Sequence, residues 1–289
     1  MSIKTVDLTH IYNKDGPYEK VAIENINIEI KQGEFVGIIG HTGSGKSTLI
    51  QHLNGIIKPT CGTVYVDDVD VFAKGTDMKG IRAKVGMVFQ YPEHQLFEEN
   101  VYKDIVFGLK NYGVDPSEFE ERALEAVQTV GLSEDVFSKS PFELSGGQKR
   151  RVAIAGVIAM RPEVLILDEP AAGLDPYGRK LILDEIRALH DKTGTTVILV
   201  SHSMEDIAYY ADRIIVMHKG AVAMDGTPCE VFSNADELEK MSLDVPQVTS
   251  VLNGIRKMGY NVRSGIFNAS DAADEIYKIL TANGDKNVK

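Results

Sequence analysis

Gly40-His41-Thr42-Gly43-Ser44-Gly45-Lys46-Ser47 lies directly after the short apolar run Phe35–Ile39 and fits the pattern G-x-x-x-x-G-K-[ST]. The residues from Lys46 onward have helical spacing. The glycines let successive backbone N–H groups converge on anionic oxygens, and the following helix adds its positive N-terminal end. A plain glycine turn would not explain a Lys-Ser pair at these places. The order strand, loop, helix therefore predicts an α/β fold with a phosphate-binding loop.

The loop also predicts individual roles. We expect Lys46 to reach the β- and γ-phosphates of a nucleotide and Ser47 to offer its hydroxyl to Mg²⁺. His41 occupies a variable position of the pattern, so only backbone contacts are expected from it. The residues predicted to bind the nucleotide are Gly40, His41, Thr42, Gly43, Ser44, Gly45, Lys46, Ser47 and Thr48.

A second stretch, Leu165-Ile166-Leu167-Asp168-Glu169, is an apolar strand that ends in carboxylates. In open α/β sheets this end of a strand lies at the edge where nucleotides bind. There Asp168 can hold Mg²⁺ and Glu169 can accept a proton from an attacking water or orient it. Taken alone, the pair also fits a solvated acidic turn. Together with the phosphate loop, it predicts the second half of a hydrolytic site.

A third stretch, Leu144-Ser145-Gly146-Gly147-Gln148, precedes a long predicted helix. A hydroxyl, free N–H groups and a helix dipole meet at this point, so it is a second helix start suited to phosphate. A serine N-cap on a glycine turn is the simpler alternative. One phosphate-loop enzyme needs only one such helix start. The second therefore indicates contact with a nucleotide held by another chain.

Apolar periodicity organises the rest of the chain. Strands are expected over residues 26–30, 35–39, 63–71 (with Val64, Val66, Val69 and Val71 as the apolar set), 85–89, 164–167, 195–200, 213–218 and 221–225, and helices over 46–53, 100–112, 117–130, 147–160 and 176–192. This alternation predicts a largely parallel sheet. After about Thr227 only amphipathic helices are expected, at 246–258 and 270–282, the second with Ser270 as its N-cap candidate.

Composition excludes several classes of protein. With 289 residues, 43% of them hydrophobic and 25% charged, the chain is a globular protein of one large domain or two modest ones. A net charge of 31 − 42 = −11 argues against nucleic-acid binding and against direct adhesion to anionic lipid. The two cysteines, Cys61 and Cys229, are expected to be free thiols. The charged N-terminus argues against a signal peptide, and the longest strongly apolar stretch, 152–160, is shorter than the ~20 residues of a membrane span.

Together these stretches resemble the ATP-binding-cassette ATPases from about Ile3 to Asp225. Residues 40–47 are similar to the Walker A motif, 165–168 with Glu169 to the Walker B motif and catalytic glutamate, and 144–148 to the signature motif. The resemblance extends to Gln90 as the Q-loop glutamine (a Mg²⁺ ligand together with Ser47 and Asp168), to Asp175 in the D-loop Ala172-Gly173-Leu174-Asp175, to His202 as the switch histidine and to Tyr12 as the aromatic that stacks on adenine. For Tyr12 a packing role is the alternative, with Tyr18 as the competitor.

The resemblance implies an ATPase coupled to transmembrane transport, with ATP and Mg²⁺ as cofactors. It also implies an ABC-type nucleotide-binding domain over 1–226, with an N-terminal antiparallel β-subdomain and a helical subdomain at about 91–160. Residues 227–289 then form a small, mainly helical appendage that serves in dimerisation.

A narrower resemblance lies in Phe89-Gln90-Tyr91-Pro92-Glu93-His94-Gln95-Leu96-Phe97 and the residues after it, up to Gly108. This run is similar to the energy-coupling-factor ATPases of prokaryotic vitamin and transition-metal uptake, and to the second of their two paralogous ATPases more than to the first. By this resemblance the residues that dock onto a transmembrane subunit are Tyr91, Pro92, Glu93, His94, Gln95, Leu96 and Phe97. If residues 95–97 were plain core, they would instead be buried.

The partners implied are a second ATPase chain, in a heterodimer rather than a homodimer, and a transmembrane scaffold subunit. The scaffold works with a substrate-binding membrane subunit, which puts this chain at the cytoplasmic face of the prokaryotic cell membrane, with no nucleic acid as partner. Three alternatives share the core motifs: the ATPase of a conventional ABC importer or exporter, a soluble cassette protein of nucleic-acid or assembly machinery, and a non-catalytic regulatory cassette. The charge of −11 weighs against the second, and the intact Lys46, Asp168, Glu169 and His202 weigh against the third.

Overall fold

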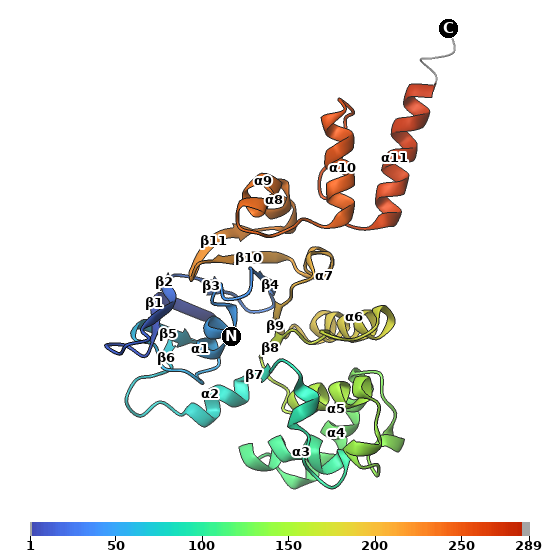
Figure 1. Cartoon of the computed structure of the whole chain (residues 1–289). Helices are drawn as coiled ribbons and strands as arrows, with labels where there is room; N and C mark the ends of the chain where they lie inside the picture. Colours follow the sequence, from blue (N-terminus) through green and yellow to red (C-terminus); the bar gives the residue numbers. More distant parts are fainter. Residues whose placement is uncertain (1, 285–289) are drawn as a thin grey trace.

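The computed structural model describes residues 2–284. Its centre is a six-stranded sheet of order β11-β10-β4-β9-β8-β7, parallel except for the antiparallel edge strand β11 (Figure 1). The strands are β4 (Phe35–Ile39), β7 (Val85–Val88), β8 (Val164–Asp168), β9 (Thr196–Val200), β10 (Arg213–His218) and β11 (Ala221–Gly226). The predicted α/β fold with a largely parallel sheet is confirmed.

Apolar layers cover both faces of this sheet. In β4, Phe35 and Ile39 belong to one buried cluster, and Val36 and Ile38 belong to the other. Neighbouring residues of a strand point to opposite faces, so a strand covered on both sides is apolar without interruption. That is why the continuous apolar runs of the sequence form the central strands. The second cluster also contains Leu49, Ile50 and Leu53 of α1 (Lys46–Leu53), so the helix that begins at the phosphate loop packs directly on the sheet.

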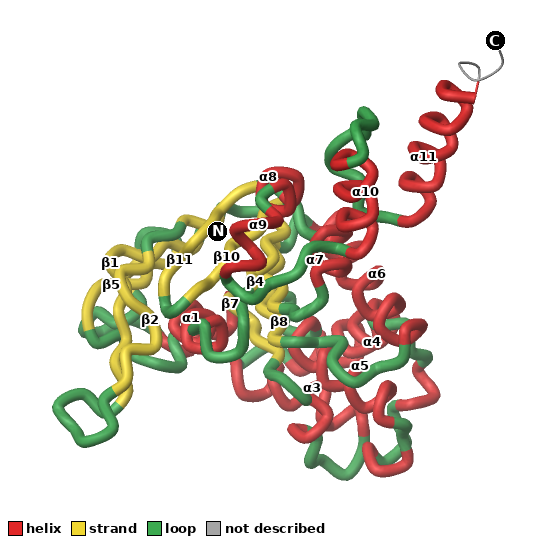
Figure 2. Tube along the Cα trace, turned by 45° about the horizontal axis from the view of Figure 1, so that its top comes forward, coloured by secondary structure: helices red, strands yellow, loops and turns green. Residues whose placement is uncertain are grey.

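A smaller antiparallel sheet stands beside it (Figure 2). Its strands are β1 (Ile3–Tyr12), β2 (Lys20–Ile26), β3 (Glu29–Ile30), β5 (Cys61–Val66) and β6 (Val69–Asp70). The single strands predicted over 26–30 and 63–71 are therefore wrong, because each is interrupted. Asp67 and Asp68 have φ angles of 49° and 62° and form a turn, so the alternation restarts after them. As a result Val69 is 48% exposed, whereas Val64, Val66 and Val71 are buried.

Three helices form a lobe at the β7 side of the sheet: α3 (Val101–Tyr112), α4 (Phe119–Thr129) and α5 (Gly146–Ile158) (Figure 1). The predicted helices match them within a few residues. The apolar stripe expected on the second of them is buried, namely Phe119, Ala123, Ala126, Val127 and Val130. The lobe shares its core with the large sheet, so it is packed against the sheet rather than tethered to it.

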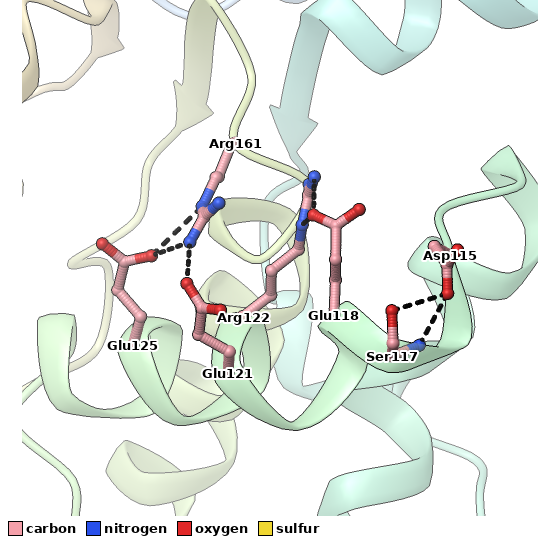
Figure 3. A network of polar contacts seen from close by, with 7 residues as sticks. All are labelled: Asp115, Ser117, Glu118, Glu121, Arg122, Glu125 and Arg161. Atoms are coloured by element: carbon pink, nitrogen blue, oxygen red, sulfur yellow. Dashed lines mark hydrogen bonds and ion pairs between the residues drawn. The ribbon is translucent and has the colours of Figure 1, made fainter.

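Ion pairs on the surface hold the end of α5 to α4 (Figure 3). Arg161, in the turn after α5, contacts Glu125 at 2.8 Å and Glu121 at 3.2 Å. Arg161 has a φ of 52°, which is uncommon for a residue other than glycine. Beside it, Arg122 contacts Glu118 at 2.7 Å within α4. Exposed pairs contribute little singly, but two glutamates on one guanidinium fix the direction of the Arg161 side chain.

Four short helices escape the sequence prediction: α2 (Met78–Lys84), α7 (Met204–Tyr210), α8 (Pro228–Ser233) and α9 (Ala235–Lys240). They have six or seven residues, too few for an apolar stripe to repeat. Their clearest signal lies in their N-caps, since Asp77, Ser203 and Thr227 each accept a backbone hydrogen bond there. The remaining helix of the core, α6 (Pro176–Thr193), is found where it was predicted.

The chain ends in α10 (Gln247–Lys257) and α11 (Ala269–Gly284), which stand away from the sheets (Figure 1). Their own small buried cluster consists of Leu252, Val262, Ile266 and Ala272. By contrast, Phe232 of α8 and Leu238 of α9 belong to the main core. Ser270 as the N-cap is wrong: α11 begins at Ala269, and the side chain of Asn268 accepts from the backbone N–H of Asp271 at 2.8 Å.

Within residues 2–284, no helix combines the length and the apolar character that crossing a membrane requires.

Cys61 and Cys229 are free thiols, as predicted, and Cys61 is exposed.

Candidate functional site

A cavity of about 320 Å³ lies where α1 begins and β8 ends. Its walls come from β1, β2, the phosphate loop, α1, β8 and the loops after β7 and β9. The residues that line it are Tyr12, Lys20, Ala22, Thr42, Gly43, Gly45, Lys46, Ser47, Thr48, Gln90, Asp168, Glu169 and His202. Thus the structure brings together in one cavity most of the residues predicted to act on one nucleotide.

The loop itself is shaped by glycine. Gly45 has a φ of +103°, and a Cβ there would lie 2.7 Å from the carbonyl oxygen of Ala22. Gly43 has a φ of +82°, and a Cβ there would meet nothing within 4 Å. These left-handed conformations suit glycine, and they let the loop wrap closely around an anion. Gly40, His41 and Ser44 are loop residues that do not line the cavity, and the buried Ser44 hydroxyl has no hydrogen-bond partner in the described part of the chain.

Lys46 lies folded against its own loop. Its Nζ donates to the carbonyl oxygen of Gly40 at 2.6 Å and to that of His41 at 3.2 Å. Burial lowers the pKa of Lys46, while the charges of Glu169 and Asp168 act in the opposite direction. The ammonium group is therefore hydrogen-bonded to neutral carbonyl oxygens, and a charged phosphate would be a stronger partner for it.

The two carboxylates at the end of β8 differ. Burial raises the pKa of Asp168, against a hydrogen bond from Ser47 and the charge of Lys46. Burial and then the neighbouring Asp168 raise the pKa of Glu169 to about 7. Glu169 also has a φ of 52°, a strained backbone of the kind found at functional sites. Asp168 is thus supported by Ser47 and Lys46, whereas Glu169 is poised near neutrality.

His202 follows β9 and faces Glu169. Its Nε2 lies 3.5 Å from Oε1 of Glu169, an oxygen that is buried and has no hydrogen-bond partner among residues 2–284. Burial, and then the charge of Lys46, lower the pKa of His202. At this distance the contact is too long for a strong hydrogen bond, so each group keeps hydrogen-bonding capacity for a ligand in the cavity that both line.

Tyr12 packs against His10, which in turn contacts His52; the sequence analysis missed both of these buried histidines. The rings of Tyr12 and His10 are 4.5 Å apart, and Nδ1 of His10 lies 3.2 Å from Nε2 of His52. His52 Nδ1 lies 2.7 Å from the carbonyl oxygen of Thr48, so it carries the proton and donates. Its Nε2 is then the acceptor, and His10 Nδ1 is the donor. The pair joins the Tyr12 wall to α1, while the competitor Tyr18 is 81% exposed and does not line the cavity.

Some predicted residues lie outside this cavity. Ser145 is the N-cap of α5, where its Oγ accepts from the N–H of Gln148 at 3.3 Å and Gln148 Oε1 accepts from the N–H of Ser145 at 3.0 Å. The cap uses Oγ only as acceptor and leaves its O–H free to donate. Asp175 caps α6 through the N–H groups of Tyr177 and Gly178. None of residues 144–148 lines the cavity of this chain.

The segment after Gln90 begins with Tyr91, which has a φ of 55°, and continues in a short 3-10 helix, Pro92–Gln95. Phe97 is 61% exposed and its ring packs edge-on against Phe107, 4.9 Å away, which is itself 40% exposed. Gln95 is exposed, Leu96 is half-buried and Pro92 is buried. Asp104 fixes the segment by accepting from the N–H groups of Phe97 at 3.1 Å and Glu98 at 3.2 Å.

Besides the histidines, the sequence analysis missed Lys20 and Ala22. They line the cavity from β2, and Lys20 is paired with Tyr12 across the two strands. The only signal for them is the pairing of β1 with β2, which was not predicted.

Comparison with known proteins shows the family of the chain. The family model described as "ABC transporter" matches residues 23–172. The chain is 55% identical, over 97% of its length and 98% of the relative, to the "Energy-coupling factor transporter ATP-binding protein EcfA2" of Clostridium tetani. Among solved structures, it is similar to cbiO1 from Clostridium perfringens, described as part of the ABC transporter complex cbiONQ, with 38% identity, a TM-score of 0.73 and coverage of 87% and 98% of the two chains. It is also similar to a dimeric ATP-binding cassette with ADP and Pi, in a post-hydrolysis state, with 31% identity, a TM-score of 0.71 and coverage of 78% and 98%.

Proposed function

The chain belongs to the ABC transporter family and, within it, to the energy-coupling-factor ATP-binding proteins, and from this we propose that it is the ATP-hydrolysing motor subunit of an energy-coupling-factor importer. One observation carries the proposal: Lys46, Asp168, Glu169 and His202 converge on one cavity, beside an exposed segment that is suited to docking. The substrates would be vitamins or transition-metal ions, taken up through a transmembrane scaffold and a substrate-binding membrane subunit.

For ATP, we assign the adenine to Tyr12 and the phosphates to the loop of residues 40–48. Lys46 would leave the carbonyl oxygens of Gly40 and His41 and turn to the β- and γ-phosphates. The carboxylate of Glu169 would take a proton from the attacking water, and His202, whose Nε2 lies 3.5 Å from that carboxylate, would contact the γ-phosphate. Each group would thereby stabilise the charge that develops in the transition state.

The donor set fits Mg²⁺. Ser47 and Asp168 bring hard oxygen ligands together beside Lys46, and Gln90 lines the same cavity. The buried Oε1 of Glu169 also lacks a hydrogen-bond partner. When bound, the ion would neutralise charge on the β- and γ-phosphates. We therefore assign Ser47, Asp168 and Gln90 as the residues that would hold it.

The second helix start suggests a dimer. Ser145 has a free O–H at the positive end of α5, outside its own chain's cavity. We assign residues 144–148 to the nucleotide of a partner ATPase, with Asp175 at the same junction, and we favour a heterodimer over a homodimer. On this view residues 1–226 form the ATPase core, with its helical subdomain at about 91–160. Residues 227–289 contribute to dimerisation through α10 and α11.

Attachment to the membrane would be through protein. The exposed side chains of Tyr91, Gln95 and Phe97 favour docking over a core role for this segment. We define residues 91–97 as the docking segment and assign them to the transmembrane scaffold. The chain would then work at the cytoplasmic face of the prokaryotic cell membrane as a peripheral subunit.

Affinity purification of the tagged chain from membranes, with mass spectrometry of the bound subunits, tests the proposal. A second ATPase, one small scaffold and a substrate-binding membrane protein are the expected partners. Recovery of a symmetric pair of permease subunits instead would assign the chain to a conventional ABC transporter. Stable recovery of ribosomes or DNA would remove it from transport altogether.

A further inference from the structure

A buried arginine on α5 is used by neither the cavity nor the cap. The side chain of Arg150 is 4% exposed. It donates to Glu93 through two nitrogens, Nε to Oε2 at 3.0 Å and Nη2 to Oε1 at 2.7 Å. Its third nitrogen, Nη1, donates to the carbonyl oxygen of Ala172. The face of the guanidinium lies 5.9 Å from the centre of the Tyr91 ring. Every nitrogen of the guanidinium is thus engaged.

These contacts join three segments that are far apart in the sequence. Glu93 and Tyr91 belong to the docking segment, and Arg150 lies five residues after Ser145 on the helix that starts at the signature motif. Ala172 follows the end of β8, and its N–H donates to the carbonyl oxygen of Glu169 at 3.2 Å. A continuous path therefore runs from Glu93 through Arg150 and Ala172 to the backbone of Glu169.

The two ends of the path are under backbone strain. Tyr91 has a φ of 55° and Glu169 has a φ of 52°. Such conformations persist only where surrounding contacts hold them. At both ends Arg150 is one of those contacts, through the Tyr91 ring and the Glu93 carboxylate on one side and through the Ala172 carbonyl on the other. A displacement of the docking segment must therefore either break the bidentate pair or move the turn that carries Glu169.

We propose that Arg150 is a positioning residue that links the docking segment to the turn bearing Glu169, so that movement at the membrane-facing side reaches the catalytic glutamate and the reverse. The proposal rests on the proposed function for what docks at residues 91–97 and for the catalytic role of Glu169. Arg150 is buried and Glu93 is half-buried, which favours this role over that of a surface ion pair. Removing Glu93 would leave the charge of a buried arginine uncompensated, so the two side chains are expected to stay together.

The chemistry requires arginine at this position. A planar guanidinium can grip both oxygens of Glu93 and still present a third nitrogen to a carbonyl, whereas a lysine ammonium is a point charge without that fork. Arg150→Lys therefore keeps the charge and removes the link. Arg161→Lys is the matched control, because Arg161 also pairs with carboxylates, those of Glu121 and Glu125, but touches neither the docking segment nor the turn of Glu169.

The first test needs no membrane partner. The chain contains no tryptophan, so Phe97→Trp places a single fluorophore in the docking segment. We expect Mg-ATP to change its emission in the otherwise unaltered chain and in Arg161→Lys, and the change to disappear in Arg150→Lys. Absence of any change in the unaltered chain, or an undiminished change in Arg150→Lys, would overturn the link whether or not the chain serves an importer.

The second test uses the complete transporter in liposomes and measures substrate imported per ATP hydrolysed. For Arg150→Lys this ratio should fall about fivefold or more, while the KM for ATP stays unchanged because Arg150 does not line the cavity. Arg161→Lys should leave both unchanged. If hydrolysis and import fall in equal proportion in Arg150→Lys, the residue supports the fold or the chemistry and the link is rejected. Should Arg150→Lys fail to fold, Glu93→Gln decides by the same criteria, since it keeps the shape of the pair and removes its charge.

Discussion

The Nε2 atom of His202 lies 3.5 Å from the Oε1 atom of Glu169, and both residues line the nucleotide cavity. Since the pKa of His202 is lowered and that of Glu169 is raised to about 7, the two do not form a strong ion pair in the nucleotide-free chain. They are instead two neighbouring, weakly paired groups, and each can turn to a bound nucleotide or water.

Glu169→Gln should separate binding from turnover. The amide cannot take a proton from water, so we expect kcat for ATP hydrolysis to fall about 10²–10⁴-fold. ATP affinity should change little, because Lys46 and the loop are untouched. Steady-state hydrolysis by the assembled ATPase dimer, together with equilibrium ATP binding, measures both. Retention of hydrolysis near the level of the unaltered protein would remove Glu169 from its assigned role.

The same substitution should also alter stability in the absence of nucleotide and Mg²⁺. The folded-state pKa of Glu169 is raised from 4.5 to about 7. The preference of the folded chain for protonated Glu169 therefore adds fully to the free energy of unfolding below pH 4.5, and this addition is lost as the pH rises through 7. The loss amounts to at most about 3 kcal/mol. Above pH 7, Glu169→Gln should melt at a higher temperature than the unaltered chain in EDTA, and the difference should vanish below pH 4.5.

His52 should make the fold sensitive to acid in the opposite sense. Burial, opposed by its hydrogen bond to Thr48, lowers the pKa of His52 from 6.5 to about 4. The stabilisation is complete above pH 6.5 and is lost as the pH falls towards 4, by about 3 kcal/mol. Chemical unfolding at several pH values should show a shallower acid loss for His52→Gln than for the unaltered chain. Parallel curves for the two proteins would exclude this group as the source.

Tyr12→Ala should weaken ATP binding about tenfold, because stacking of a base on an aromatic ring contributes about 1–3 kcal/mol. The control is Tyr18→Ala, since Tyr18 is exposed and lies outside the cavity. Tyr12→Trp offers a direct spectroscopic measurement in a chain that has no other tryptophan. Its fluorescence should change on binding ATP. Equal ATP affinities for Tyr12→Ala and Tyr18→Ala would leave Tyr12 as a packing residue only.

The sequence predicted those parts of the site whose residues are neighbours along the chain. The phosphate loop, the acidic end of β8 and the serine before α5 are runs of neighbouring residues whose chemistry can be read in order. The central strands could be predicted for the same reason, because burial on both faces leaves an uninterrupted apolar run.

What could not be predicted depends on contacts between distant residues. His10 and His52 are 42 positions apart, and Glu93 and Arg150 are 57 apart. No spacing rule connects such pairs, since only the tertiary fold brings them together. The short helices α2 and α7 were not predicted for another reason, because one or two turns are too short for an apolar pattern to repeat. The strand predicted over residues 63–71 was wrong because a two-residue turn at Asp67 and Asp68 reverses the alternation of apolar and polar residues.

The small buried cluster of α10 and α11 has a consequence for the life of the subunit in the cell. Few apolar side chains hold these helices, and Met258, Tyr277 and Leu280 are more than half exposed. Segments with so little buried surface open at low free energy, and opened segments are where proteases cut first. If α10 and α11 contact the partner ATPase as proposed, a chain without that partner would be cut first at this end. Copies in excess of the complex would be removed, and the stoichiometry of the transporter would be kept by survival of assembled subunits rather than by matched synthesis.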